Sequence, residues 1–460
     1  MRLPSLVLVL ALAGCPDRSI STVFPSQGKV ETKDIPAVPR RDVDILFLID
    51  DSGSMKEEQD SLRANFSKFM GVLETLDGGM PNVHIGVATS DLGSSGNDGT
   101  VASVPGTGCT GHGEDGAMRT ASMINGRFIS DVDDGSGGRS VNYSGTLEDA
   151  FAAIADVGTA GCGIEQHLGA VERALQNPAN AGFLRDGAYL AVVVIGDEDD
   201  CSLEHSSLFT SSSDPIAINF ACTKDGVTCD DNPDFSVAGK RNTCHPSASP
   251  KYVQDVTRYV DFLKSLKPDP KDVIVAGILG DPTPFEIIND TTHSETVLGP
   301  SCHYVSTTGT DQTAFPAVRT ADFLSRFEER NTRATICQGD LSAGLTQVAA
   351  LLKVVIADPC FEANVADLDP DMPGLQPDCT VSDMRYANGE ETEVAVIPSC
   401  ALSGGAVPCW RIEEDAVHCS YTNTDPHLKL VVDRGGVIPT PDIHVKASCV
   451  TTGDAPGPQM

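Results

Sequence analysis

Residues 43–55 read VDILFLIDDSGSM, an almost uninterrupted apolar run that ends in acidic and small polar residues. Such a run is typical of a strand that is buried on both faces of a parallel sheet. Three further apolar runs have the same character, at residues 83–89, 189–196 and 273–280. The sequence therefore predicts at least four buried strands, and the first and third of them end in acidic residues.

Amphipathic segments lie between and after these runs. Residues 56–76 place Leu62, Phe66 and Phe69 on one helical stripe, and four further segments show a similar helical pattern. These four segments are residues 147–154, 168–175, 253–266 and 341–356. Because strands and helices alternate, we predict an α/β fold with a doubly wound, mostly parallel sheet over residues 42–358. Ligands of such sheets bind beyond the carboxyl ends of the strands, near the switch in strand order.

Oxygen-bearing side chains follow two of the predicted strands. Asp50, Ser52 and Ser54 come from one tight loop after the first run, and Asp197 follows the run at 189–196. Hard oxygen donors that leave some positions to water suit Mg²⁺ better than Zn²⁺. These residues therefore predict one exposed site for a divalent cation. The alternative is that Asp50 and Ser54 only cap the following helix.

The order of strand, Asp50-x-Ser52-x-Ser54, amphipathic helix and a later strand ending at Asp197 resembles the von Willebrand factor type A (VWA) domain and its metal-ion-dependent adhesion site. This resemblance implies that one Mg²⁺, or Mn²⁺ or Ca²⁺, is held by Asp50, Ser52, Ser54, Asp197 and a threonine from a middle loop. It also implies that a partner's acidic group completes the metal shell. The threonine in the matching loop is Thr159, which lies a few residues earlier than the family spacing would place it, so Glu165 is the rival ligand.

The first residues have the pattern of an export signal. Residues 1–14 carry one charge and an apolar stretch, which predicts a signal peptide. The sequence LAGC at residues 12–15 resembles the lipobox of bacterial lipoproteins, which implies that Cys15 is acylated. Residues 15–41 lack periodicity and contain several prolines, so we expect this lipidated cysteine to begin a flexible tether. The alternative is an ordinary secretory signal with Cys15 in a disulfide.

The cysteines indicate an oxidising compartment. Of the 15 cysteines, 14 remain after Cys15, an even number that allows complete pairing. Long insertions near residues 91–143, 202–250 and 281–316 carry some of them, and residues 359–460 carry six. We expect this last segment to be a small disulfide-rich, mainly β region. We also expect Cys162 to pair with Cys201, because both follow strand ends of the proposed site.

Charge and motifs limit the functions that this chain can have. It has 32 Lys+Arg and 65 Asp+Glu, a net charge of −33, which argues against nucleic acid as a partner and leaves the acyl anchor as the contact with a bilayer. Motifs of serine hydrolases, zinc proteases and phosphate-binding loops are absent, so we expect no enzyme. The favoured interpretation is a lipid-anchored binding or adhesion protein of the cell envelope, at the outer membrane, whose partner is a protein or surface glycan. The alternatives are a structural scaffold and a hydrolase with two metals at Asp50, Asp51, Asp197 and Glu198.

Overall fold

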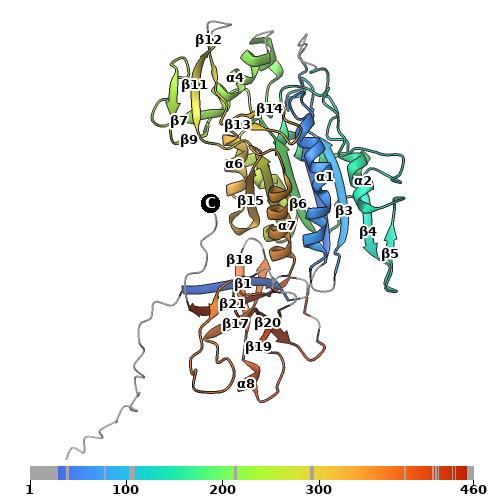
Figure 1. The fold of residues 1–460 in the computed structure, drawn as a ribbon, viewed down its shortest axis with the longest axis vertical. Helices are drawn as coiled ribbons and strands as arrows, with labels where there is room; N and C mark the ends of the chain where they lie inside the picture. The colour runs from blue at the N-terminus through green and yellow to red at the C-terminus, as the bar shows by residue number, and fades with distance from the viewer. Residues whose placement is uncertain are drawn as a thin grey trace, which may run out of the picture.

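A computed structural model describes residues 29–37, 41–76, 79–102, 109–211, 215–290, 295–357, 359–387, 390–416, 419, 422, 424–437, 439–440 and 442–452. These residues form an α/β domain with a smaller β domain at one end (Figure 1). The predicted signal peptide and the predicted acylation of Cys15 lie outside the described residues. Across the described ranges, no helix combines the length and the apolar character that crossing a bilayer requires.

The α/β domain is built on a seven-stranded sheet with the order β15-β10-β6-β2-β3-β4-β5. Its strands are β2 (Asp42–Ile49), β3 (Asn82–Thr89), β4 (Ile129–Asp133), β5 (Arg139–Val141), β6 (Tyr189–Gly196), β10 (Val273–Leu279) and β15 (Asn331–Thr335). All four predicted strands are present. The five strands from β15 to β3 are parallel, and β4 and β5 add an antiparallel edge. The sheet is therefore mostly parallel, as predicted.

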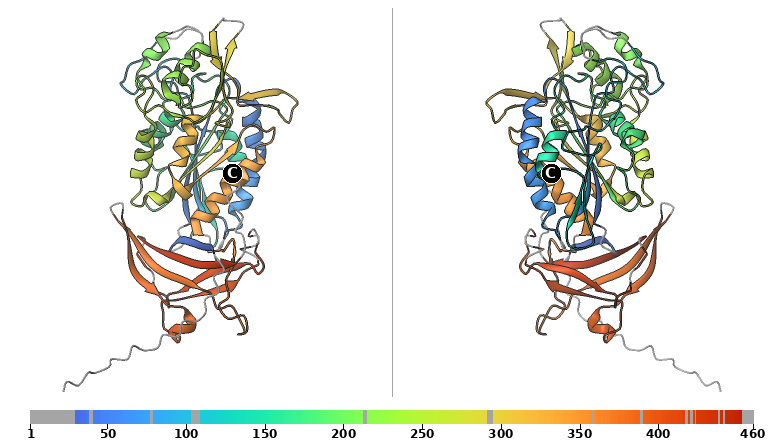
Figure 2. Two further views of the ribbon diagram at one scale, coloured as in Figure 1. Left: turned by 90° about the vertical axis from the view of Figure 1, so that its left-hand side faces the viewer. Right: turned by 90° about the vertical axis from the view of Figure 1, so that its right-hand side faces the viewer.

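Helices cover both faces of this sheet (Figure 2). One face is covered by α1 (Lys56–Leu73), α2 (Leu147–Ile154) and α7 (Ser342–Ala357), and the other by α3 (His167–Gln176), α5 (Val256–Ser265) and α6 (Val318–Ser325). Successive side chains of β2 alternate between the two cores: Phe47 packs with Phe66 and Phe151 on the first face, and Leu46 lies in the core of the second. Burial on both faces makes the apolar run of β2 continuous rather than alternating.

Two of the insertions pack together at the end of the α/β domain that lies away from the β domain (Figure 1). The 202–250 insertion forms η2 (Ser206–Ser211), α4 (Pro215–Gly226), β7 (Val227–Cys229), β8 (Gly239–Arg241) and β9 (Cys244–Pro246). The 281–316 insertion forms β11 (Phe285–Asp290), β12 (Glu295–Leu298), β13 (Cys302–Val305) and β14 (Asp311–Ala314). Strand β8 pairs with β11, which joins the two. The segment 91–143 is not wholly an insertion, because it supplies β4 and β5 of the main sheet.

The smaller domain is mainly β, as predicted. A five-stranded antiparallel sheet contains β1 (Lys29–Pro36), β16 (Asn364–Val365), β17 (Cys379–Ala387), β18 (Glu390–Ile397) and β21 (Ile443–Thr452). A hairpin-like pair, β19 (Cys409–Glu414) and β20 (Leu428–Asp433), and the short α8 (Cys400–Ser403) complete it. The prediction of a flexible tether over residues 15–41 is wrong for residues 29–36. These residues pair with β21 along their whole length, through backbone hydrogen bonds that leave little trace in the side-chain pattern of an edge strand.

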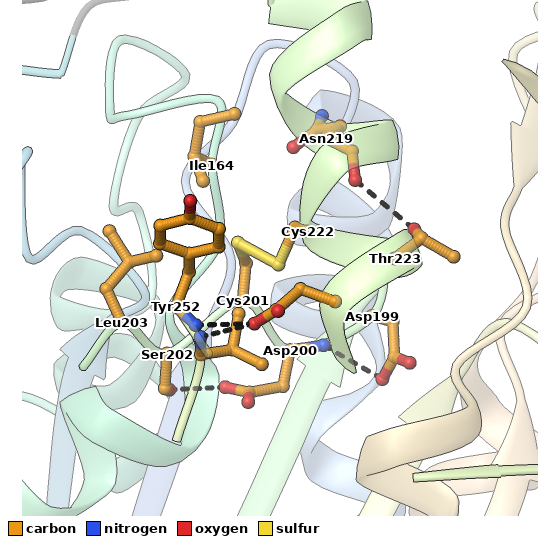
Figure 3. The surroundings of a disulfide bond; sticks show 12 residues. Ile164, Asp199, Asp200, Cys201, Ser202, Leu203, Asn219, Cys222, Thr223 and Tyr252 are labelled. Atoms are coloured by element: carbon orange, nitrogen blue, oxygen red, sulfur yellow. Dashed lines mark hydrogen bonds between the residues drawn. A yellow bond between two sulfur atoms is a disulfide. The ribbon is translucent and has the colours of Figure 1, made fainter. Parts of the chain in front are cut away.

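Seven disulfides pair the 14 cysteines that follow Cys15, which confirms the expectation of complete pairing. The predicted bond between Cys162 and Cys201 is wrong. Cys162 bonds to Cys109, and Cys201 bonds to Cys222 of α4 (Figure 3). The two loops do meet, since the Cys201 amide donates to the Glu165 carbonyl at 2.7 Å. Each of the two loops, however, is bonded to a cysteine of an insertion instead of to the other loop.

Candidate metal centre

The switch in strand order lies between β2 and β6, which are neighbours in the middle of the sheet. After β2 the chain continues to β3 on one side, and after β6 it continues to β10 on the other. The carboxyl ends of the two strands therefore border the crevice in which doubly wound sheets bind ligands. The Asp50 amide donates to the Ile195 carbonyl at 2.9 Å, which fixes the end of β2 beside that of β6. Asp50 and Asp197 thus begin two adjacent loops.

Hydrogen bonds order the first loop around the Asp50 carboxylate. The Ser52 amide donates to Asp50 Oδ1 at 2.7 Å, and the Ser52 and Ser54 hydroxyl oxygens are 3.1 Å apart. Ser54 also hydrogen-bonds the Asp197 side chain. Asp50 and Asp197 are buried, whereas Ser54 is exposed. Four predicted ligands therefore lie together, and of these Ser54 is open to solvent.

The middle loop brings Glu165 rather than Thr159 to these carboxylates. Glu165 is 1% exposed, hydrogen-bonds Glu198, and interacts with the charges of Asp50 and Asp197. Thr159 is half-buried, and in the described part of the chain no hydrogen bond joins its hydroxyl to any of these acidic groups. The rival ligand of the sequence prediction is thus the better placed one. Glu198 lies in the same group, although the predicted adhesion-type set did not include it.

Three of these carboxylates have a buried oxygen without a hydrogen-bond partner, namely Asp50 Oδ2, Glu165 Oε1 and Asp197 Oδ1. Leaving such an oxygen unpaired in the interior costs about 1–3 kcal/mol, and more when it is charged. Among the described residues, no Lys or Arg forms an ion pair with this group. The chemistry of the site therefore fits a divalent cation with hard oxygen ligands. Its carboxylates are spread too widely to supply three ligand atoms within 4.8 Å, so the serine hydroxyls would have to contribute.

The electrostatics of the site show the same need for a cation. Burial raises the pKa of Asp50 to about 7, and the charge of Glu198 acts in the same direction. Burial likewise raises the pKa values of Glu165 and Asp197 well above the usual range of carboxyl groups. His167, whose Nε2 is 3.9 Å from Asp50 Oδ2, does not supply positive charge, because burial lowers its pKa to about 4.

The insertions form the rim of this site. Asn219 of α4 donates to Glu198 Oε2 at 3.1 Å, and the Phe315 amide donates to the Asp197 carbonyl at 2.7 Å. Next to Glu198 lies a cavity of about 300 Å³, whose mainly apolar walls include Phe220 and Leu298. An occupant of the metal site would therefore have an apolar recess beside it.

Comparison with known proteins gives distant similarities to solved structures. No protein-family model and no curated protein matches this chain. Among solved structures, it is similar to a von Willebrand factor type A protein from Catenulispora acidiphila, with a TM-score of 0.28 and 11% identity over 94% of this chain and 67% of that one. The pilus adhesin SpaC from Lactobacillus rhamnosus GG gives a TM-score of 0.30 and 11% identity over 93% of this chain and 41% of that one. The pilus adhesin RrgA from Streptococcus pneumoniae gives a TM-score of 0.28 and 12% identity over 92% of this chain and 58% of that one.

The chain thus spans less than two thirds of the length of either pilus adhesin. TM-scores of this size establish neither a common fold nor a common activity. The strand order and the geometry of the strand-end site are the grounds on which its function can be discussed.

Proposed function

We propose that this protein is a VWA-like binding or adhesion protein that engages its partner through one divalent cation at the ends of β2 and β6. The observation that supports this proposal is the group of buried carboxylates with unpartnered oxygens beside two serine hydroxyls. Asp50, Ser52, Ser54, Glu165 and Asp197 would hold the ion, which is Mg²⁺, Mn²⁺ or Ca²⁺. Ser54 is exposed, so an oxygen of the partner can reach the ion from that side.

The number of carboxylates bears on the chemistry of the partner. Glu165 and Glu198 share one proton in their hydrogen bond, so if Asp50 and Asp197 are ionised, three negative charges surround one divalent ion and the site keeps a net charge of −1. Such a site repels an acidic group at close range and favours a neutral oxygen donor. A sugar hydroxyl or a carbonyl oxygen therefore fits better than the acidic group that the family resemblance implies, and a surface glycan fits at least as well as a protein.

The location of the protein belongs to the same proposal. Acylation of Cys15 would anchor it in the cell envelope, at the outer membrane, and the acyl chain would be its contact with the bilayer. The net charge of −33 supports an acyl chain as the only contact with the bilayer, because this charge disfavours binding to nucleic acid and to an anionic membrane surface. Replacing Cys15 by Ala should release the protein from membranes into the soluble fraction. A variant that stays on membranes through a high-salt wash would contradict the anchor.

A hydrolase is the second candidate, and the observation that favours it is the position of Glu198 beside Asp50 and Glu165. A two-metal site needs bridging carboxylates of this kind. We favour a non-enzymatic role, since the serine hydroxyls suit a single ion with an open coordination position. Comparison of the metal content of wild type and Asp50→Ala separates the candidates: loss of one ion in the variant supports binding, loss of two supports hydrolysis, and no loss supports a scaffold.

Binding itself is tested with three proteins, wild type, Asp50→Ala and the exposed control Asp371→Ala, each with and without chelator. Retention on envelope extracts and on immobilised neutral or acidic glycans is the readout. We expect binding by wild type and by the control in Mg²⁺, and its loss with chelator or in Asp50→Ala. Equal retention of all the proteins, each folded by circular dichroism, would overturn the proposal.

A further inference from the structure

A second group of buried acidic and imidazole side chains lies far from the strand-end site, where the α/β domain meets the β domain. Asp269 and Asp272 belong to the segment between α5 and β10, at the amino-terminal edge of the main sheet, and His444 belongs to β21 of the other domain. All three residues are buried. One ligand atom from each lies within 4.8 Å of the other two.

Two of these atoms face each other without forming a hydrogen bond. His444 Nε2 is 3.3 Å from Asp269 Oδ2, yet this oxygen is buried and has no hydrogen-bond partner. Asp269 as a whole is only 8% exposed, so water does not readily replace the missing partner. Two ligands of a tetrahedral Zn²⁺, each about 2.0–2.1 Å from the ion, lie about 3.3 Å apart. His444 Nε2 and Asp269 Oδ2 are thus as far apart as two ligand atoms that bind the same metal ion.

The second ring nitrogen of His444, Nδ1, lies beside a carboxylate, as it does in many metal sites. Asp34 Oδ1 of β1 is 3.2 Å from His444 Nδ1, and Lys271 Nζ donates to Asp34 Oδ2 at 2.5 Å. A carboxylate at Nδ1 favours the tautomer that carries its proton there, which leaves the Nε2 lone pair available to a metal ion. Metal-bound histidines usually have such a carboxylate or carbonyl partner.

The surroundings of the Asp269 carboxylate disfavour its negative charge. Burial raises the pKa of Asp269, and the neighbouring Asp272 carboxylate acts in the same direction. Lys271 directs its ammonium group to Asp34 and lies 3.6 Å from Glu391. The buried Lys267 interacts with the charge of Asp272 and donates to the Arg185 carbonyl. A cation between Asp269, Asp272 and the imidazole would offset this repulsion.

We propose that Asp269, Asp272 and His444 bind one divalent transition-metal ion, and that this ion joins the two domains. Imidazole nitrogen with two carboxylates is a ligand set for Zn²⁺, whereas Mg²⁺ and Ca²⁺ prefer oxygen ligands alone. Asp34 is a positioning residue that orients His444. This site is independent of the strand-end site and of the function proposed for it.

The experiment uses the full chain with Asp50→Ala as the parent, so that the strand-end ion does not contribute. Zn²⁺ binding is measured by calorimetry and by metal content after dialysis, and Co²⁺ replaces Zn²⁺ for absorption spectroscopy. We expect one Zn²⁺ per parent chain, loss of binding in His444→Gln and Asp272→Asn, and an affinity about 10–100-fold lower in Asp34→Asn. His303→Gln, which changes an exposed histidine, is the matched control and should bind as the parent does.

Two results would overturn the proposal: a parent that takes up no Zn²⁺, or equal binding by the parent and His444→Gln. The Co²⁺ spectrum decides the matter even where a variant fails to fold, because it is recorded on the folded parent. Intense visible bands of a low-coordinate ion support the site, and the weak spectrum of hydrated Co²⁺ contradicts it.

Discussion

Asp50 illustrates how one side chain can be unfavourable for folding and yet suited to the cation site that we propose. Its carboxylate is completely buried, one oxygen has no partner, and its pKa in the metal-free protein is about 7. In the unfolded chain this group ionises near pH 4. The folded, metal-free protein therefore carries a penalty for ionising Asp50 that a bound cation would remove.

We predict that Asp50→Asn stabilises the metal-free protein at pH 8 while it removes stabilisation by Mg²⁺. The amide keeps an oxygen to accept the Ser52 N–H but carries no charge to desolvate. Thermal unfolding in chelator and in Mg²⁺ is the measurement, and each kcal/mol corresponds to about 2–4 °C in domains of 150–250 residues. A variant that is less stable than wild type in chelator would contradict the buried-charge interpretation.

The raised pKa of Asp50 predicts that the stability of the protein depends on pH. Between about pH 4 and pH 7 the unfolded state has released the Asp50 proton and the folded, metal-free state retains it, so stability falls as the pH rises. We expect the melting temperature in chelator to be lower at pH 8 than at pH 5, and this difference to shrink in Mg²⁺ and in Asp50→Asn. Identical pH profiles of wild type and Asp50→Asn in chelator would show that Asp50 does not titrate in this range.

The sequence predicted part of the site for a physical reason. Asp50, Ser52, Ser54 and Asp197 directly follow buried strands, and adjacent parallel strands must bring their carboxyl ends together. Glu165 could be named only as a rival to Thr159, because the position of a loop residue depends on contacts that spacing does not encode. The unpartnered oxygens and the closeness of Glu198 arise from packing and have no sequence pattern.

At the scale of the elements, the disulfide between Cys109 and Cys162 ties the first insertion to the middle loop that carries Glu165. We predict that changing both cysteines to Ala lowers stability by roughly 4 kcal/mol in the loop-entropy model and weakens metal binding. The control is Cys400→Ala with Cys409→Ala, which opens a loop of nine-residue separation in the β domain. This control variant should lose less stability than the first variant and should keep its metal affinity unchanged. Denaturant unfolding and calorimetry measure both, and equal metal affinity of the two variants would contradict a positioning role for the first disulfide.

Which elements could be predicted follows from burial. Strands β2, β3, β6 and β10 are enclosed on both faces, so their sequences are apolar and recognisable. Strand β15 reads NTRAT, since it lies at an edge where backbone pairing alone suffices. Disulfide partners could not be predicted, because seven pairs among 14 cysteines depend on how the insertions fold.

At the scale of the whole molecule, strand β1 makes the amino-terminal segment part of the last domain. We predict that a chain beginning at residue 41 has a less stable β domain than one beginning at residue 28, whereas the α/β domain is little affected. The reason is that removal of β1 exposes the backbone of β21 and the packing position of Ile35. Limited proteolysis followed by mass spectrometry locates the cleavages, and cleavage rates in residues 359–452 that are equal in both chains would contradict the prediction.

The pairing of β1 also determines how a mechanical load would cross the molecule. A pull between an upstream anchor and a partner bound at the strand-end site enters at Lys29, passes along β1 and then along β2, and leaves at Asp50. Strand β2 lies between β3 and β6 and would be drawn along its own axis. The hydrogen bonds on both of its sides would then share the force together instead of opening one after another. The backbone hydrogen bonds of β1 and β2 would therefore carry tension on the chain before it reaches the strand-end site.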